Sequence, residues 1–559
     1  MSEQSPVYEL ADAFVRDYAA LAPNWATEVG VRGHDHEMTD FGPDGNQARA
    51  ELARRTLHAL DAAEVRSDRD RVAAAVMRER LETALAEHDA GEDVRDIRVI
   101  ASPIQDVRAV FDLMAFSTGE DWDIVSERLA HVPDALDSLR ARFEAGRAHG
   151  LLAARRQVLE CAKQAATWGG ETDGDPFFVR MVADHAPRFA DDARQRILDE
   201  RAQEATAAYA EFARYLRETY LPDAPDRDPV GAERYALTAR AYCGAELDLD
   251  DTYQWGWDEL HRIEDAMLDC AHRILPGASI AEAADHLEHD DARTIDGAEE
   301  FLAWNQRVID ETIAALHGTH FDIPEPVRTC EAMLAPPGGA AAMYYTPPSE
   351  DFSRPGRTWY PTLGHTRFPL WREVTTVYHE SVPGHHLQIG QVQYLADVLS
   401  RFQRVSFVSG HGEGWALYAE RLMGELGYLD DPAHELGMLA AQAMRAVRVI
   451  VDIGMHLERT IPASEDYHPG ERWTPQLALP FVVERARQPA DFMRSEVDRY
   501  LGWPGQAISY KVGERVWLEA RAEAQARHGG GFDLAAFHRY ALDLGSMGLD
   551  PLRAELARF

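Results

Sequence analysis

Histidine and glutamate residues gather in one short segment, WREVTTVYHESVPGHHLQIGQ, in which His379 and Glu380 precede His385 and His386. Two histidines four positions apart on a helix present both imidazoles on one face, where they can bind Zn²⁺. A glutamate beside the first histidine then lies next to the metal-bound water and can take its proton. Here Pro383 occupies the position of the second histidine, so the standard spacing fails.

Helix geometry shows what must replace that spacing. At ~100° per residue, His385 would point away from His379 on an ideal helix, and His386 would share its face but lie ~10 Å along the axis. Pro383 has no N–H and clashes with the carbonyl of His379, which deforms the helix. Gly384 supplies the backbone freedom to recover. We predict a two-residue bulge, after the glutamate and ending at Gly384, that returns His385 to an effective four-residue offset.

The third ligand is expected from a following helix. The segment GHGEGWALYAERL offers Glu413 at a helix start and Glu420 two turns later. Two histidines and one carboxylate form a zinc site that keeps a position open for water. We therefore predict a Zn²⁺ site made of His379, His385 and Glu413. His386 and Glu420 are the alternates.

Helical periodicity dominates the elements that must position these residues. Apolar residues recur every three or four positions in segments rich in Ala, Leu, Arg and Glu, such as 46–61, 71–90 and 194–219. Proline and aspartate cluster in LPDAPDRDPVG, residues 221–231, and this composition marks a break. We predict a helical N-terminal lobe over 1–228 and a mainly helical catalytic lobe over 229–559.

One stretch just before the metal motif departs from the helical pattern. Between residues 324 and 366, aromatic and β-compatible residues stand among prolines and glycines, which favours a few short strands. This small β element would lie near the site. It forms either an edge that pairs with an extended peptide or a hairpin that only covers the site.

Composition excludes some classes of partner. The chain has 559 residues, of which 45% are hydrophobic, so it can bury a sizeable core. Acidic residues outnumber basic ones 95 to 57, a formal net charge of -38. That charge repels phosphate backbones and anionic membranes, so we expect no nucleic acid and no membrane partner.

The cysteines and the N-terminus indicate a compartment. The four cysteines are far apart and show no paired metal-binding spacing, which fits a reducing environment. The first residues lack a basic stretch followed by an apolar one, so we expect no secretory signal. The most apolar long stretch, residues 438–457, is interrupted by charged residues and does not fit a membrane span. We therefore expect a cytoplasmic protein; its oligomeric state is not indicated.

Four motifs in order, HESVPGHHLQ, EGWALYAERL, RVIVDIGMH and RYLGWPGQAISYKVGE, resemble a large bacterial family catalogued as a domain of unknown function. The resemblance places that family in the gluzincin-like clan of zinc peptidases, with thermolysin-like and angiotensin-converting-enzyme-like members. It implies a mostly helical, two-lobed fold with a deep cleft. Clan members without the inserted pair carry the second histidine ligand in a Gly-His-x-Leu stretch. Gly384, His385, His386 and Leu387 match that stretch, which selects His385.

The catalytic groups follow from the metal motif and from the resemblance. Glu380 would take the proton of the water and pass it to the leaving amine. The oxyanion needs a donor beyond the metal. Clan relatives use a late tyrosine for this, often with a histidine, and RYLGWPGQAISYKVGE offers Tyr510 as first choice and Tyr500 as second. Each tyrosine can equally be a packed side chain with an ordinary hydrogen bond.

A polar stripe runs along an otherwise apolar helix. RAVRVIVDIGMH places Arg445, Arg448, Asp452 and His456 at spacings of three and four. Buried charges need partners, so the stripe forms a second shell that orients metal ligands, an arginine site for a substrate carboxylate, or a structural ion network. Arg448 and His456 are accordingly candidate site residues.

These observations predict a zinc metallopeptidase that hydrolyses peptide bonds, most simply of short peptides. One alternative is a metal-dependent amidase or esterase acting on a non-peptide substrate. Another is a non-catalytic helical binding protein that retains the fold. The presence of Glu380 favours an enzyme, since a binding protein has no need of a carboxylate beside the metal.

Overall fold

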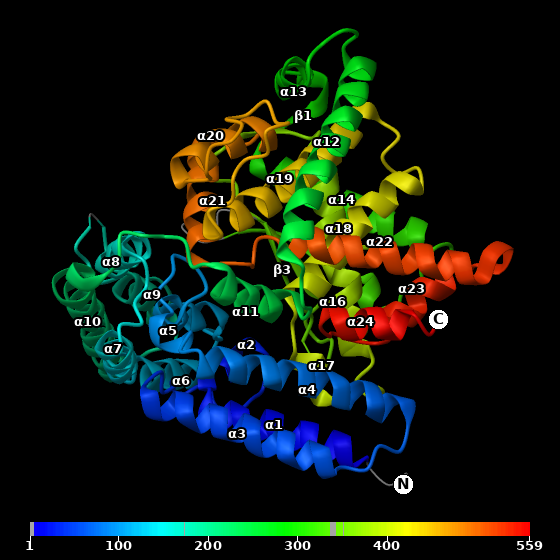
Figure 1. Ribbon diagram of the computed structural model, residues 1–559. Coiled ribbons are helices and arrows are strands. Elements are labelled where there is room, and N and C mark those ends of the chain that lie inside the picture. Colours follow the sequence, from blue (N-terminus) through cyan, green and yellow to red (C-terminus); the bar gives the residue numbers. More distant parts are fainter. Residues whose placement is uncertain (1–4, 173, 336–342, 350) are drawn as a thin grey trace. The chain divides into compact units, whose positions relative to one another are not determined.

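The computed structural model of the chain describes residues 5–172, 174–335, 343–349 and 351–559. Helices dominate it and the strands are few and short, which confirms the prediction of a mainly helical fold (Figure 1). The chain forms two compact units. One comprises Met1–Val65, Arg80–Pro229 and Leu501–Trp503, and the other Arg66–Glu79, Val230–Tyr500 and Pro504–Phe559.

The first unit is helical, and α10 (Asp192–Tyr215) is central to it, packing against α6, α7, α8 and α9. Its core is rich in large apolar and aromatic side chains, among them Trp122, Phe143 and Phe178. Its helices, besides α10, are α1 (Pro6–Leu21), α2 (Pro23–Glu28), α3 (Pro43–Ala62), the later part of α4 (Asp68–Asp89), α5 (Pro103–Ala109), α6 (Gly119–Ala130), α7 (Val132–Ala148), α8 (Arg155–Trp168) and α9 (Phe177–His185).

The second unit contains every candidate site residue. Two helix pairs form its centre: α12 (Leu249–Ile274) packs along α19 (Pro432–His456), and α18 (Ser409–Glu425) packs along α22 (Ser509–His528) (Figure 1). Its other helices are α11 (Ala232–Cys243), α13 (Ile280–Glu288), α14 (Ala298–Leu316), α15 (Glu373–Glu380), α16 (His385–Tyr394), α17 (Arg401–Val405), α20 (Pro475–Ala486), α21 (Ala490–Gly502), α23 (Leu534–Leu542) and α24 (Leu549–Leu556).

Two small sheets lie in the second unit. In the first, β2 (Cys330–Leu334) pairs in parallel with β4 (Gly356–Tyr360), which pairs antiparallel with β3 (Tyr344–Thr346). These strands fall within the stretch predicted to be β, of which residues 336–342 and 350 lie outside the described residues. In the second, β1 (Thr294–Asp296) pairs antiparallel with β5 (Arg367–Pro369). This pairing joins residues 71 to 75 positions apart in the sequence, such as Asp296 with Arg367 and Thr294 with Pro369, and was not expected from the sequence.

Glycines let the central helices approach closely. A Cβ on Gly414 of α18 would lie 2.5 Å from the Cα of Gly513 in α22, so a side chain at this position would separate the two helices. A Cβ on Gly256 of α12 would lie 2.9 Å from Val449 in α19. Close approach at these positions fixes the relative position of the helices that carry the candidate site.

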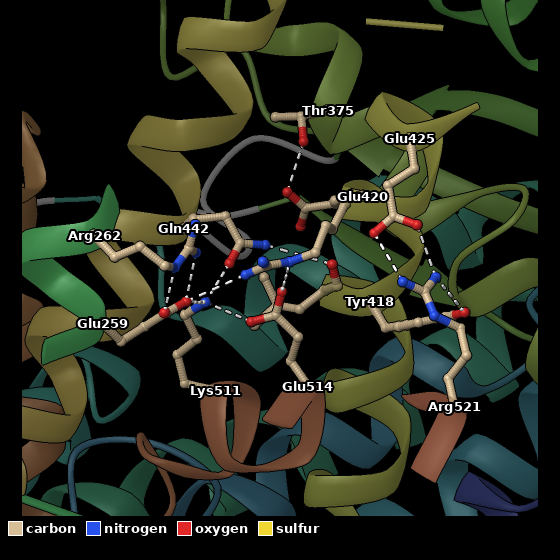
Figure 2. Close-up of polar contacts among 12 residues, drawn as sticks. Glu259, Arg262, Thr375, Tyr418, Glu420, Glu425, Gln442, Lys511, Glu514 and Arg521 are labelled. Carbon is tan, nitrogen blue, oxygen red and sulfur yellow. Dashed lines mark hydrogen bonds and ion pairs between the residues drawn. The ribbon is translucent and has the colours of Figure 1, made fainter. Parts of the chain in front are cut away.

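A buried ion network ties the same four helices together. The ammonium of Lys511 on α22 donates to Glu259 on α12, Gln442 on α19 and Glu514 on α22, as Figure 2 shows. Arg421 on α18 donates to Glu259 and Glu514. Because breaking a buried pair leaves an unpaired charge, the network resists relative movement of these helices.

Two further features bear on compartment and membrane contact. The four cysteines, Cys161, Cys243, Cys270 and Cys330, are free and buried. Among the described residues, no helix is both long and apolar enough to cross a bilayer.

Candidate metal centre

The HESVPGHH segment connects two helices rather than bulging within one. Helix α15 ends at Glu380 and α16 begins at His385. The Gly384 N–H donates to the Tyr378 carbonyl at 3.0 Å, across six residues instead of the four of an α-helix. Two residues are thus looped out, and His385 follows at the effective offset predicted for it.

Gly384 is required at this connection. A Cβ there would overlap the backbone carbonyl oxygens of His379 and Tyr378 far inside van der Waals contact. The loop is held from outside by Trp415 of α18, whose indole N–H donates to the Pro383 carbonyl at 2.8 Å. Trp415 was not predicted from the sequence, although it stands two residues after Glu413 in the same motif.

Three predicted ligands come together at this connection. The Nε2 of His379 lies 3.4 Å from the Oε2 of Glu413, and the Nε2 of His385 lies 3.6 Å from the same oxygen. One ligand atom from each of the three residues lies within 4.8 Å of the others. Ligand atoms 2.0–2.2 Å from a tetrahedral Zn²⁺ stand roughly 3.3–3.6 Å apart. The three side chains therefore fit one zinc ion with little adjustment.

Hydrogen bonding supports the same fit. The Glu413 Oε2 is buried and has no hydrogen-bond partner within the described part of the chain. Buried polar atoms are normally paired, and a carboxylate oxygen that faces two imidazole nitrogens is a normal metal ligand. The donor set of two imidazoles and one carboxylate matches zinc better than calcium or magnesium, which prefer oxygen.

Electrostatics favour positive charge among these side chains. Burial lowers the pKa of the His379 imidazole, but Glu413 and Glu420 outweigh this and hold it at about 10. Burial raises the pKa of Glu413, yet interactions with His379 and His385 keep it well below its usual range. A divalent cation, which binds neutral imidazole and ionised carboxylate, would take the place of these protons.

Glu420, the alternate third ligand, instead holds His379 in position. Its Oε1 lies 2.7 Å from the His379 Nδ1. Its Oε2 accepts a hydrogen bond from Thr375 at 2.6 Å, as Figure 2 shows. A carboxylate that accepts from Nδ1–H fixes the imidazole with its Nε2 free, the arrangement usual for a metal-bound histidine. Glu420 therefore contacts the predicted ligand His379 and is not itself placed as a ligand.

His386, the alternate second ligand, points elsewhere. Its Nε2 lies 2.8 Å from the Val327 carbonyl, to which it must donate, and its Nδ1 then accepts from the Tyr345 hydroxyl at 2.9 Å. Burial lowers the pKa of His386 to about 4, so the ring is neutral. Both of its nitrogens are engaged away from Glu413. The Tyr345 contact places β3 of the small sheet beside the metal-binding segment.

Glu380, the predicted base, ends α15 directly after His379. Its side chain is largely buried. Its charge acts on the imidazole of His379 and on the side chains of Tyr360 and Cys330. The carboxylate therefore neighbours the ligand set without belonging to it.

Tyr510, the first candidate donor, stands at the start of α22. Burial raises the pKa of its hydroxyl, and the nearby charge of Glu413 raises it further, so the group stays protonated and able to donate. The guanidinium of Arg448 lies over its ring, 4.8 Å from the centroid. This side chain therefore contacts the polar stripe of α19, and the charge of one predicted metal ligand acts on it.

Tyr500, the second candidate, is held within the protein. Its hydroxyl donates to Glu496 at 2.8 Å and accepts from the Arg448 Nε at 3.0 Å, and the side chain is fully buried. Tyr510 is thus the tyrosine on whose hydroxyl the charge of Glu413 acts. Arg448 is the member of the stripe that connects the two tyrosines.

His456 and Asp452 lie at the other end of the stripe and support the backbone. The His456 Nε2 donates to the Tyr500 carbonyl at 3.0 Å. Asp452 accepts from the Tyr235 hydroxyl at 2.8 Å and from the Gly505 N–H at 3.0 Å, which anchors the turn that leads to Tyr510. Both side chains act on the chain that carries the tyrosines, not on the ligand set.

Two solved structures share this fold. One, described as the crystal structure of the "putative lipoprotein" from Colwellia psychrerythraea, has 22% identity and a TM-score of 0.85 and covers 99% of both chains. The other, described as a "putative lipoprotein of unknown function" from Shewanella oneidensis, has 17% identity and a TM-score of 0.74, and covers 98% of this chain and 99% of that one. At these identities the likeness concerns the fold alone.

Comparison of the sequence with models of protein families identifies the family of this chain. The model of a family described as "Bacterial protein of unknown function (DUF885)" matches residues 23–556, nearly the whole chain. No curated protein sequence matches. The cytoplasmic location and the absence of a nucleic-acid partner stay predictions.

Proposed function

We propose, from the premise that this chain belongs to the bacterial DUF885 family of proteins of unknown function, that it is a zinc-dependent hydrolase of peptide bonds. The observation that carries the proposal is the convergence of His379, His385 and Glu413. The Nε2 atoms of His379 and His385 stand 3.4 and 3.6 Å from the Glu413 Oε2. Glu380 adjoins them, which distinguishes a hydrolytic site from a purely structural one.

His379, His385 and Glu413 would hold the ion. Zinc bound by two histidines and one carboxylate supplies a water of lowered pKa and polarises a substrate carbonyl. Glu420 accepts from the His379 Nδ1–H and so keeps that imidazole oriented. Trp415 holds the Pro383 carbonyl and thereby the loop that brings in His385.

Glu380 moves the protons. Its carboxylate accepts one proton from the attacking water, whose oxygen bonds to the acyl carbon. The same group then gives that proton to the amide nitrogen as the carbon–nitrogen bond breaks, so one carboxylic acid and one amine leave. Burial of the carboxylate excludes bulk water from this transfer.

Tyr510 stabilises the developing negative charge. Its raised pKa keeps the hydroxyl protonated at neutral pH, so it can donate to the carbonyl oxygen as charge develops there. Its ring packs against the Arg448 guanidinium at 4.8 Å, which restricts its position. A fixed donor of this kind contributes to the transition state without reorganising.

A digest of a synthetic peptide library, read by mass spectrometry, tests this function. We expect the zinc-loaded full chain to cleave a subset of peptides, chelation to abolish cleavage, and added zinc to restore it. The Glu380→Gln variant, purified in parallel, controls for a contaminating peptidase. Cleavage that survives chelation, or that is equal in the variant, would remove the assignment. Cleavage of esters or small amides, but of no peptide, would place the same chemistry on another substrate.

A further inference from the structure

Arg448 of α19 is a buried guanidinium with one unpaired nitrogen. The residue is 4% exposed. Its Nε donates to the Tyr500 hydroxyl at 3.0 Å and its Nη2 to Glu496 at 2.7 Å. Its Nη1 is also buried and has no hydrogen-bond partner among the residues that the structure describes. A buried charged donor without a partner is costly, so this nitrogen is suited to an anionic ligand.

Other arginines accompany Arg448. Arg499 donates to Glu496 at 2.9 Å, so two guanidiniums share one carboxylate. Arg445 lies one turn before Arg448 on α19 and adds a third cation. We call Arg445, Arg448 and Arg499 the arginine cluster.

The arginine cluster faces the same tyrosine as the metal ligands. Tyr510 has the Arg448 guanidinium over its ring at 4.8 Å. The charge of Glu413 and the charges of all three arginines act on the hydroxyl of Tyr510. Arg445 also acts on Glu420, the partner of His379. A substrate group bound by the arginine cluster would therefore place the neighbouring peptide bond beside the predicted metal ligands.

We propose that the arginine cluster binds the free carboxylate of a peptide substrate, and that the chain therefore cleaves short peptides near their carboxyl end. The inference rests on the proposed hydrolysis. A planar guanidinium pairs with a carboxylate through two parallel N–H groups, a geometry that lysine does not offer. The chain as a whole carries a formal net charge of -38, which repels anions. Attraction of a carboxylate therefore has to come from a local group of arginines.

Paired substrates test the inference. We compare one peptide with a free C-terminal carboxylate and the same peptide with a C-terminal amide. For the full zinc-loaded chain, kcat/KM for the acid should exceed that for the amide by about 10- to 100-fold, the size expected of one charge-assisted pair. Arg448→Met should bring the ratio of kcat/KM for the acid to that for the amide to about one, in addition to any common fall of both values that comes from the loss of packing on Tyr510. A merely structural Arg448 would lower both values equally.

A matched variant and a conservative variant keep the test decisive. Arg485 pairs with Glu264 at 3.0 Å, away from Tyr510, and Arg485→Met should leave the acid-to-amide ratio unchanged. If Arg448→Met does not fold, Arg448→Lys retains the charge but loses the paired nitrogens, and should reduce the ratio in part. Equal kcat/KM for acid and amide in the wild type would overturn the inference.

Binding separates this inference from the proposed function. Calorimetric titration of both peptides into the metal-free Glu380→Gln chain measures recognition without hydrolysis. We expect the acid to bind at least about 10-fold more tightly than the amide, and the difference to disappear when Arg448→Met is added. Discrimination in binding with no hydrolysis of either peptide would sink the proposed function and leave the carboxylate site standing. Hydrolysis of both peptides without discrimination in binding would overturn the carboxylate site and leave the proposed function standing.

Discussion

Replacing Glu380 by glutamine is expected to abolish hydrolysis and to leave zinc binding intact. Glutamine has nearly the same shape but cannot accept the proton of the attacking water. A positioned general base contributes about 10²- to 10⁴-fold to rate, so kcat should fall by at least that factor. His379, His385 and Glu413 are unchanged in this variant, and zinc content should remain equal to that of the wild type. Initial rates and metal analysis on one preparation measure both quantities.

Glu373→Gln is the matched control for this variant. Glu373 begins the helix that Glu380 ends, and burial raises its pKa to about 7, so glutamine resembles its protonated form. Its replacement should change the rate by less than about threefold, the usual scale for a site outside the chemistry. Substantial turnover by zinc-loaded Glu380→Gln would show that another group is the base.

The second large effect is expected from the two adjacent histidines. His385→Ala should strip zinc about as fully as His379→Ala, because each removes one of three ligands. His386→Ala should keep most of the zinc, because that imidazole is engaged by the Val327 carbonyl and the Tyr345 hydroxyl. Loss of an outer-shell partner costs about 10- to 100-fold in metal affinity, far less than loss of a ligand.

Competitive zinc titration at micromolar protein distinguishes the two histidine variants. Thermal unfolding of each variant is the control, since His386→Ala removes two buried hydrogen bonds and should lower stability by about 1–3 kcal/mol without removing zinc. The opposite pattern, with zinc lost from His386→Ala and kept by His385→Ala, would contradict the register of the loop. Zinc kept by both would exclude the segment as a source of ligands.

The connection between the histidines was partly predictable. Pro383 excludes a continuous helix, and the need to bring two imidazoles together requires two looped residues, a count that the Gly384–Tyr378 hydrogen bond matches. The sequence predicted one bulged helix, whereas the structure ends α15 and starts α16. Helix geometry predicts the number of extra residues in this connection. It does not predict that Trp415, which is distant in sequence, holds the loop.

Ligand and partner roles were harder to separate. Glu413 and Glu420 lie two turns apart on one face of α18, so helical spacing alone makes both eligible. The packing of α15 on α18 decides which of the two carboxylates faces the Nε2 atoms of His379 and His385. Local periodicity does not encode that packing. The same limit applies to Tyr500 and Tyr510, since the partnership of Tyr500 with Glu496 depends on the packing of α21.

The short strands mark another limit. The β2, β3 and β4 strands were expected from aromatic and β-compatible residues between prolines and glycines, and they occur there. The pairing of β1 with β5 involves three residues on each side. Strands of that length carry too few positions for an alternating pattern, so only the folded chain reveals them.

The most direct test of the account is an anomalous difference map at the zinc absorption edge. Crystals of the full chain grown with zinc would be measured at energies just above and just below the edge. A zinc ion held by these side chains would give one strong peak, present only above the edge, within bonding distance of the His379 Nε2, the His385 Nε2 and the Glu413 Oε2. A peak beside His386, or zinc bound elsewhere with none between these three atoms, would contradict it.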